Sequence, residues 1–207
     1  EPGLLIVKNT SSSDSWYVKV DSSNSFSYNR YLKLNTNSTF TTDNTIWAGA
    51  DATSTVFSVG GTNTNNNNDN YVAYLFASGD QSFGTNGDEA IIKCGTYTGD
   101  GQNSGNTIDV GFEPQWVLIK ALETSGRDWH ILDTARDFHK DNIARLYTNQ
   151  TLAEEDQSSG IQIRSNGFEL FNGGDDLNKS GDDYLYVAIR RPHKPPDAAT
   201  DVFAIDQ

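Results

Sequence analysis

Methionine is absent from the 207 residues, and the chain begins at Glu1. Since a newly translated chain starts with methionine, we expect the sequence to be a processed or truncated piece. Cysteine occurs once, as Cys94, so no internal disulfide framework can form. Its place in the alternating stretch AIIKCGTY predicts a small strand residue rather than a reactive thiol.

Basic residues and long apolar runs are also scarce. There are 15 Lys and Arg against 28 Asp and Glu, which gives a net charge of −13 and a pI near 4.4. This balance argues against nucleic acid or an anionic membrane as the main partner. No apolar run approaches the roughly 18 residues that a membrane-spanning helix needs, and no signal peptide is visible. The composition favours a soluble extracellular or particle-surface protein.

Motifs of catalysis are missing as well. The chain has no Gly-x-Ser-x-Gly elbow, no Cys/His grouping with zinc spacing and no Gly-rich phosphate loop. The three histidines, His130, His139 and His193, are scattered, and we interpret His130 as a polar-face or rim residue. Two carboxylates could hydrolyse a glycoside, but nothing selects one pair among 28 acids. We therefore predict no catalytic residue, no cofactor and no enzymatic activity.

One acidic loop could bind a cation. Residues 172–183 offer several oxygen ligands of the kind that Ca²⁺ prefers, although the EF-hand spacing is absent. The corresponding loop at 60–70 is mostly Asn, so turn formation and solvation are the simpler shared requirement. Whether a metal binds is left open at this stage. The candidate ligands are Asp175, Asp176, Asn178, Asp182 and Asp183.

The main positive signal is an internal repeat. Five blocks recur in the same order, at offsets between 111 and 115 residues. This order predicts two copies of one structural unit, with insertions and deletions in the loops. The matched blocks are 1–8 with 113–120, 14–21 with 127–133, 34–39 with 146–151, 56–61 with 167–174 and 70–76 with 185–191.

The second copy carries a segment that the first lacks. Residues 89–110 read as a strand, a turn rich in Gly, Asn and Ser, and a second strand. We therefore divide the chain into a first module (1–86) without lead-in strands, a second module (87–192), and a Pro-rich linker with a strand-like tail (193–207).

Almost all local signals are those of strands. LLIVK and WVLIK suit strands buried on both faces, and WYVKV places Trp16, Val18 and Val20 on one face. Only 151–157 and 133–138 look helical, each for a turn or two. We predict an all-β fold of two tandem antiparallel β-sandwich modules, jelly-roll-like and related by duplication. The predicted core comprises Leu5, Val7, Trp16, Phe57, Val117, Ile119, Trp129 and Phe168.

The ordered blocks also resemble a known group of proteins. VGFEPQWVLIK, WHILDTARDF, LYTNQTLAEE, SNGFEL and SGDDYLYVAIRRP, with STVFSVGG and NDNYVAYLFA in the first copy, are similar to repeated modules of bacteriophage tail-fibre and virion-surface proteins, notably of marine phages. The likeness runs from Glu1 to about Pro192. NKSGDDY keeps the family's Asn-x-Ser-Gly turn, whereas NNNNDNY does not.

This resemblance implies a structural, non-enzymatic protein on the virion surface. It implies contact with a host glycan or outer-membrane protein, without identifying receptor-binding residues. The implied partners are other virion proteins and other copies of the chain, usually a trimer in such fibres, with no nucleic acid and no membrane insertion. A capsid decoration or head fibre protein is the alternative, and a carbohydrate-active enzyme on a β-sandwich is a weaker one.

The missing lead-in carries one further expectation. Without those strands, the first module should have a sheet edge with unpaired backbone groups, which natural proteins cover or pair. The covering segment could be a strand of a neighbouring subunit, such as 201–206, or a preceding segment of the same polypeptide.

Overall fold

We describe the protein from a computed structural model, which covers residues 2–20, 27–78, 90–136, 138, 142–158, 160–171 and 176–191. These residues form three antiparallel sheets, a short helix α1 (Gly61–Asn65) and a 3₁₀ turn η2 (Thr134–Arg136). The predicted all-β class is confirmed. No helix in this described part of the chain is long and apolar enough to cross a membrane.

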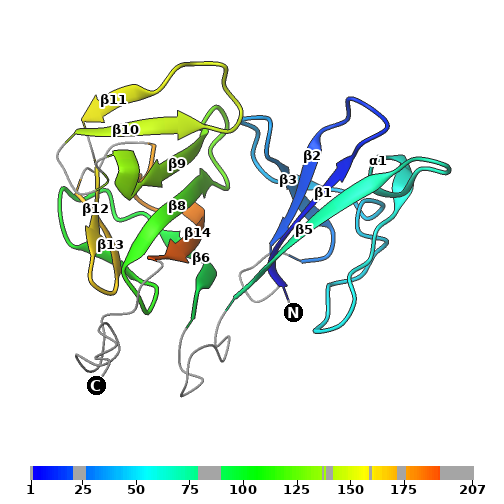
Figure 1. Cartoon of the computed structure of the whole chain (residues 1–207), viewed down its shortest axis with the longest axis horizontal. Helices are drawn as coiled ribbons and strands as arrows, with labels where there is room; N and C mark the ends of the chain where they lie inside the picture. Colours follow the sequence, from blue (N-terminus) through cyan, green and yellow to red (C-terminus); the bar gives the residue numbers. More distant parts are fainter. Residues whose placement is uncertain are drawn as a thin grey trace, which may run out of the picture.

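The first module contains a five-stranded sheet in the order β4-β3-β2-β1-β5. Its strands are β1 (Pro2–Asn9), β2 (Trp16–Val20), β3 (Arg30–Lys33), β4 (Thr41–Thr42) and β5 (Tyr71–Ala77). Figure 1 labels four of these strands, β1, β2, β3 and β5. The central strand β1 is buried along most of its length, because both of its faces and both of its edges are covered. The uninterrupted apolar run in its sequence is the expected pattern for such a strand.

The second module contains a six-stranded sheet in the order β11-β10-β9-β8-β14-β6, and a three-stranded sheet in the order β12-β13-β7. The strands are β6 (Ile92–Thr98), β7 (Asn106–Asp109), β8 (Pro114–Ala121), β9 (Trp129–Asp133), β10 (Asn142–Tyr147), β11 (Glu155–Ser158), β12 (Ile161–Arg164), β13 (Gly167–Leu170) and β14 (Asp183–Arg190). The predicted lead-in therefore supplies β6 to one sheet and β7 to the other.

The two larger sheets share one strand order. The strand order β4-β3-β2-β1-β5 in the first module corresponds to β11-β10-β9-β8-β14 in the second, and β6 is an additional strand beside β14. The registers agree as well, because Lys8 pairs with Trp16 as Lys120 pairs with Trp129. Each sheet also has a register shift at the same place, opposite the start of β1 and of β8. These matches in order and register are what a duplicated unit would show.

The ladders correct two of the sequence alignments between the modules. Pairing with β1 and β8 makes Leu75 the counterpart of Ala188, whereas the sequence blocks matched Ala73 to Ala188. Pairing with β2 and β9 likewise makes Lys33, not Asn35, the counterpart of Tyr147. Each error is a slip of two residues. Such a slip keeps every side chain on its face, so the apolar pattern cannot reveal it.

Three apolar cores lie between the layers of the molecule. The two larger sheets face each other, and Leu4, Ile6 and Val18 pack in one core with Leu118 and Val187. The opposite face of the six-stranded sheet packs against the small sheet in a second core. The opposite face of the five-stranded sheet is covered by the segment that contains Ile46 and Trp47. Members of the second core include Val117, Ile119, Leu132, Ile161, Phe168, Leu170, Tyr184 and Tyr186.

Hydrogen bonds join the modules where the two larger sheets meet. The indole Nε1 of Trp129 donates to the Lys33 carbonyl at 3.0 Å, and the Thr148 hydroxyl donates to the Leu34 carbonyl at 2.6 Å. At the other end, the Ser78 hydroxyl bonds the backbone of Cys94, donating to its carbonyl at 2.8 Å and accepting from its amide at 3.1 Å. The modules are therefore one packed body.

Most of the predicted core is buried, as expected, but Trp16 and Phe57 are only half-buried. The predicted helix at 151–157 is wrong: residues from Glu155 onward form β11, whose pairing with β10 outweighs a weak local helix preference. The turn predicted at 133–138 is confirmed as η2. Cys94 is a buried strand residue, as predicted.

Candidate functional site

The outer edge of β5 is the most distinctive surface of the first module. Among the described strands, β5 pairs only with β1, whereas its counterpart β14 pairs with β8 on one side and β6 on the other. The side chains differ accordingly. Tyr74 and Leu75 are 45% and 53% exposed, while their counterparts Val187 and Ala188 are 1% and 0% exposed. The position that is interior in one sheet is an open apolar edge in the other.

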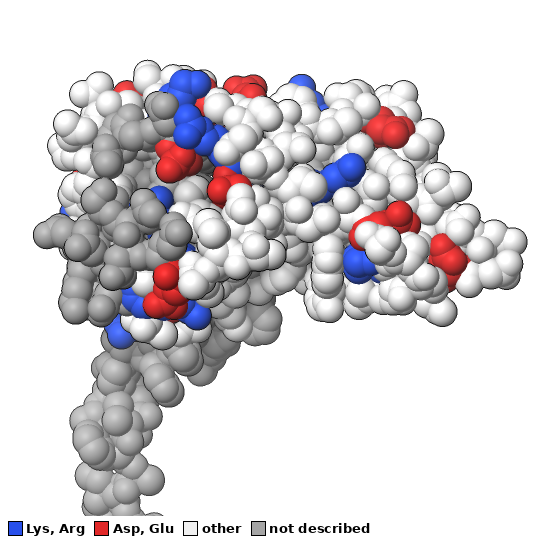
Figure 2. Space-filling view, turned by 90° about the horizontal axis from the view of Figure 1, so that it is seen from above, with Lys and Arg blue, Asp and Glu red and all other residues white. Residues whose placement is uncertain are grey.

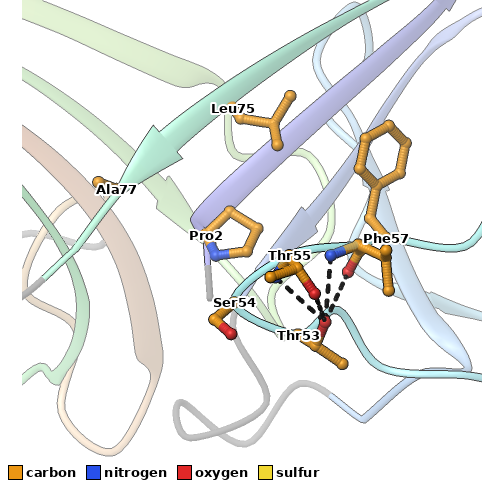
Figure 3. Close-up of a pocket in the computed structure, with 8 residues that line it drawn as sticks. Pro2, Thr53, Ser54, Thr55, Phe57, Leu75 and Ala77 are labelled. Atoms are coloured by element: carbon orange, nitrogen blue, oxygen red, sulfur yellow. Dashed lines mark hydrogen bonds between the residues drawn. The ribbon is translucent and has the colours of Figure 1, made fainter.

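A pocket of about 390 Å³ adjoins this edge (Figure 3). Its lining comes from the start of β1, from β5 and from the loop that carries Phe57. Leu75 lies opposite Leu5 in the ladder, so it belongs to the sheet face that the loop covers. The Thr53 hydroxyl accepts from the amides of Thr55 and Val56, which holds the loop in a tight turn beside the pocket. The lining residues are Pro2, Thr53, Ser54, Thr55, Val56, Phe57, Leu75 and Ala77.

The corresponding place in the second module is filled. Pro114 and Ala188, the counterparts of Pro2 and Leu75, are both buried. The lead-in contributes two side chains, Ile108 and Val110, to the core that contains Ala188, and Phe112 just after the lead-in adds a third. The pocket and the open edge therefore coincide with the part of the first module that has no lead-in among the described residues.

Asn178 fastens the lead-in turn to the second module. It is fully buried, its amide nitrogen donates to the Asp100 carboxylate at 2.8 Å, and its oxygen accepts from the Asn106 amide at 2.7 Å. The Asp100 backbone amide also donates to that oxygen, at 3.1 Å. Because an unpaired buried amide is costly, this network fixes the path between β6 and β7.

The turns before the last strands of the two modules have the same geometry. Asn68 and Gly181 hold corresponding positions, with φ of 66° and 82°. The hydroxyl of Tyr71 accepts from the Asn66 amide at 2.8 Å, as the hydroxyl of Tyr184 does from the Lys179 amide at 3.0 Å. The change from NKSGDDY to NNNNDNY thus keeps the turn, because Asn tolerates the left-handed region better than most residues.

The candidate cation ligands point to separate partners. Asp176 pairs with Arg127 at 2.7 Å, Asp182 with Lys179 at 3.2 Å, and Asn178 lies in the network above. Asp183 accepts from the Thr98 hydroxyl at 2.6 Å. Asp175 is outside the described residues. No group of three or more His, Cys, Asp or Glu that could hold a metal occurs in the part of the chain that the structure describes.

Two buried basic side chains lie on opposite faces of the six-stranded sheet, His130 on the face of Ile119 and Lys120 on the face of Trp129. His130 is buried rather than at a rim, and burial, with a smaller contribution from the Arg145 guanidinium, lowers its pKa to about 3. Neither ring nitrogen has a hydrogen-bond partner within the described residues. Burial lowers the pKa of Lys120 to about 8, although the Asp128 carboxylate opposes the shift, and its amine donates to the Ala121 carbonyl at 2.8 Å. His139 and His193 lie outside the described residues.

The charged side chains on the surface are dispersed. On the face shown in Figure 2, acidic and basic residues are interspersed among uncharged ones. The sequence indicates an open edge but not the pocket, because the loop at 53–57 meets β5 only through the fold. The one sequence signal for it is Leu75, an apolar residue in a strand without a lead-in partner.

Comparison with known families gives one match. A family model described as a domain of unknown function, DUF7483, matches residues 1–192. The matched range spans both modules and ends where the Pro-rich linker begins. No curated protein and no solved structure matches the chain.

Proposed function

The chain belongs to the DUF7483 family, and we propose that it is a structural, non-enzymatic module of a virion-surface appendage, a tail fibre that contacts the host receptor. The observation that carries the proposal is the repeated sheet. Two sheets of one strand order pack through a shared apolar core and are joined by hydrogen bonds at both ends. Such a body is a rigid building unit whose polar loops can vary without disturbing the core.

The sequence resemblance supports the same function, since its blocks fall on the elements that build the core. WVLIK and YLYVAIR are the central strands β8 and β14, and SNGFEL provides β13. The host contact in this proposal involves a surface glycan or an outer-membrane protein. The acidic net charge agrees with a partner other than nucleic acid.

Labelling intact particles tests the proposal. Gold-conjugated antibodies against the purified chain, applied to the phage that encodes it and viewed by electron microscopy, should mark the tail fibres. Label on the capsid would instead establish the head-fibre or decoration alternative. Particles without label, in a preparation where antibodies to a known virion protein do bind, would refute a virion-surface function.

A host-binding assay tests the second half of the proposal. Fluorescent chain should bind cells of the susceptible host and reduce phage adsorption when added in excess. Resistant cells that lack the receptor are the matched control and should bind little. Release of oligosaccharides from host polysaccharide by the chain would contradict the non-enzymatic assignment.

A further inference from the structure

We propose that β5 is a strand-acceptor site, and that its occupant is an extended segment from outside the described residues that pairs with β5 as β6 pairs with β14 and carries an apolar side chain opposite Leu75. The acceptor comprises the open edge of Tyr71–Ala77 and the pocket beside Leu75. The inference concerns how one module is completed by another segment. It does not rest on the virion-surface proposal.

The first argument is that β5 lacks most of the devices that protect sheet edges, since the one irregularity in its ladder is the register shift opposite Pro2–Leu4 at its end. Edge strands are usually short, charged, bulged or interrupted by proline. β5 has seven residues and none of them is charged or proline. The five other edge strands among those described are each shorter or charged: β4 has two residues, β11 carries Glu155 and Asp156, β6 carries Lys93, β12 carries Arg164 and β7 carries Asp109.

The second argument is the precedent within the chain. β14 is the counterpart of β5, and β6 pairs antiparallel with it over seven residues, from Ile92 opposite Ile189 to Thr98 opposite Asp183. A strand in the same position beside β5 would pair with the first module from Phe76 to Asn70. It would bury the exposed faces of Tyr74 and Leu75, as β6 and its neighbours bury Val187 and Ala188.

The third argument is that the pocket selects a side chain. Directly opposed residues of an antiparallel pair point to the same face. The residue opposite Leu75 would therefore point to the face where the pocket lies, and an apolar side chain there would fill it. In β6 the residue in that position is Lys93, opposite Ala188.

A second position distinguishes the occupant from β6 itself. Gly95 lies opposite Tyr186, and a Cβ at Gly95 would lie 2.5 Å from the Tyr186 hydroxyl oxygen. The counterpart of Tyr186 in β5 is Ala73, which has no ring. The site beside β5 therefore has room for a side chain larger than that of glycine opposite Ala73. A valine at this position of the occupant should improve its packing against β5.

A fusion tests the proposal with the full chain. A copy of residues 90–112, joined directly ahead of Glu1, reproduces the spacing by which the lead-in precedes Glu113. The copy carries Gly95→Val and Lys93→Leu. Amide hydrogen exchange in 71–77 should slow by roughly tenfold or more relative to the unfused chain, because the outer backbone groups become paired. Exchange in β14 should not change.

Two controls make the result specific. The same fusion with Cys94→Pro and Thr96→Pro in the copied segment cannot pair along its length and should leave exchange in 71–77 at the unfused rate. Leu75→Lys in the productive fusion should restore fast exchange, whereas Leu152→Lys, at an equally exposed apolar residue outside the ladder and the pocket, should leave the edge paired and the protection intact.

Other outcomes would overturn the inference. Equal exchange in the two fusions would show that no strand pairs with β5. If the unfused chain forms a dimer in sedimentation that Leu75→Lys abolishes, the edge pairs with a second copy and the proposed occupant is wrong. A synthetic peptide of residues 90–99 with the same two substitutions, added to the unfused chain, should give the same protection if the fusion does not fold.

Discussion

β5 and β14 hold the same position in two sheets of one strand order, yet one is an open edge and the other an interior strand. Over the corresponding stretches 71–76 and 184–189 both strands are apolar and uncharged, so the difference does not arise within these stretches. It arises because β6 and the end of the lead-in lie against β14, and no described segment does so for β5. Whether the last strand of a module is buried therefore depends on a separate segment of about twenty residues, the lead-in.

The same comparison holds for single residues. Trp129 is fully buried and bonded to Lys33 across the module boundary, whereas Trp16 is half-buried and stacks on Tyr74 with ring centroids 6.2 Å apart. His130 occupies the position of Tyr17, and both are buried. The modules therefore share a framework but differ in what each position contributes to stability.

The two tryptophans should differ most in their effect. Trp129→Ala should lower the free energy of unfolding by roughly 3–5 kcal/mol, because it removes a fully buried ring and leaves a cavity. Trp16→Ala should cost about 1–2 kcal/mol, since its side chain is only partly buried. Urea unfolding followed by circular dichroism measures both. Equal losses of unfolding free energy in the two variants would mean that Trp16 and Trp129 contribute equally to stability.

His130 should make the protein sensitive to acid. The folded pKa is about 3 and the unfolded value about 6.5, so between these values the unfolded chain binds more protons, and the free energy of unfolding falls as the pH is lowered. The expected loss from this group is about 3 kcal/mol between pH 6.5 and pH 4. His130→Leu should remove that part of the pH dependence. A variant with an unchanged pH profile would show that another group controls it.

Much of the fold follows from sequence pattern alone. The apolar runs of β1 and β8 identified the central strands, and the alternation in WYVKV placed Trp16 and Tyr17 on opposite faces. The pattern could not fix the register of the last strand, because a shift of two residues conserves the faces. It also could not place Glu155 in a strand, since only pairing with Arg145 and its neighbours defines β11.

The candidate site was predictable only in part. The absence of a lead-in predicted an open edge in the first module, and β5 has one among the described strands. The pocket depends on the loop around Phe57 meeting Leu75, a contact between residues far apart in the sequence. The burial of His130 was missed because a local pattern cannot tell which sheet face will be covered by another sheet. The tail at 201–206, one of the segments proposed from the sequence to cover the edge, lies outside the described residues.

Lys120 should give a pH dependence of the same sign as that of His130, but in the alkaline range. Its folded pKa of about 8 lies below the unfolded value of about 10.4, so between them the unfolded chain again binds more protons and the free energy of unfolding rises with pH. The gain should be about 2 kcal/mol between pH 8 and pH 10. Lys120→Met should flatten this rise. An unchanged pH profile in this variant would show that another group causes the rise.

The smallest expected effect concerns the turn that both modules share. Gly181 has a φ of 82° and open space around its Cβ position, so a substitution there meets only the backbone preference. Gly181→Asn copies the residue that the first module uses at Asn68 and should change the free energy of unfolding by less than about 0.5 kcal/mol. Gly181→Val should cost about 1–2 kcal/mol, because a β-branched residue is strained at positive φ. Thermal unfolding of the two variants measures the difference. If Asn and Val cost the same, the turn in the second module is not held in the left-handed conformation, and its likeness to the turn at Asn68 ends there.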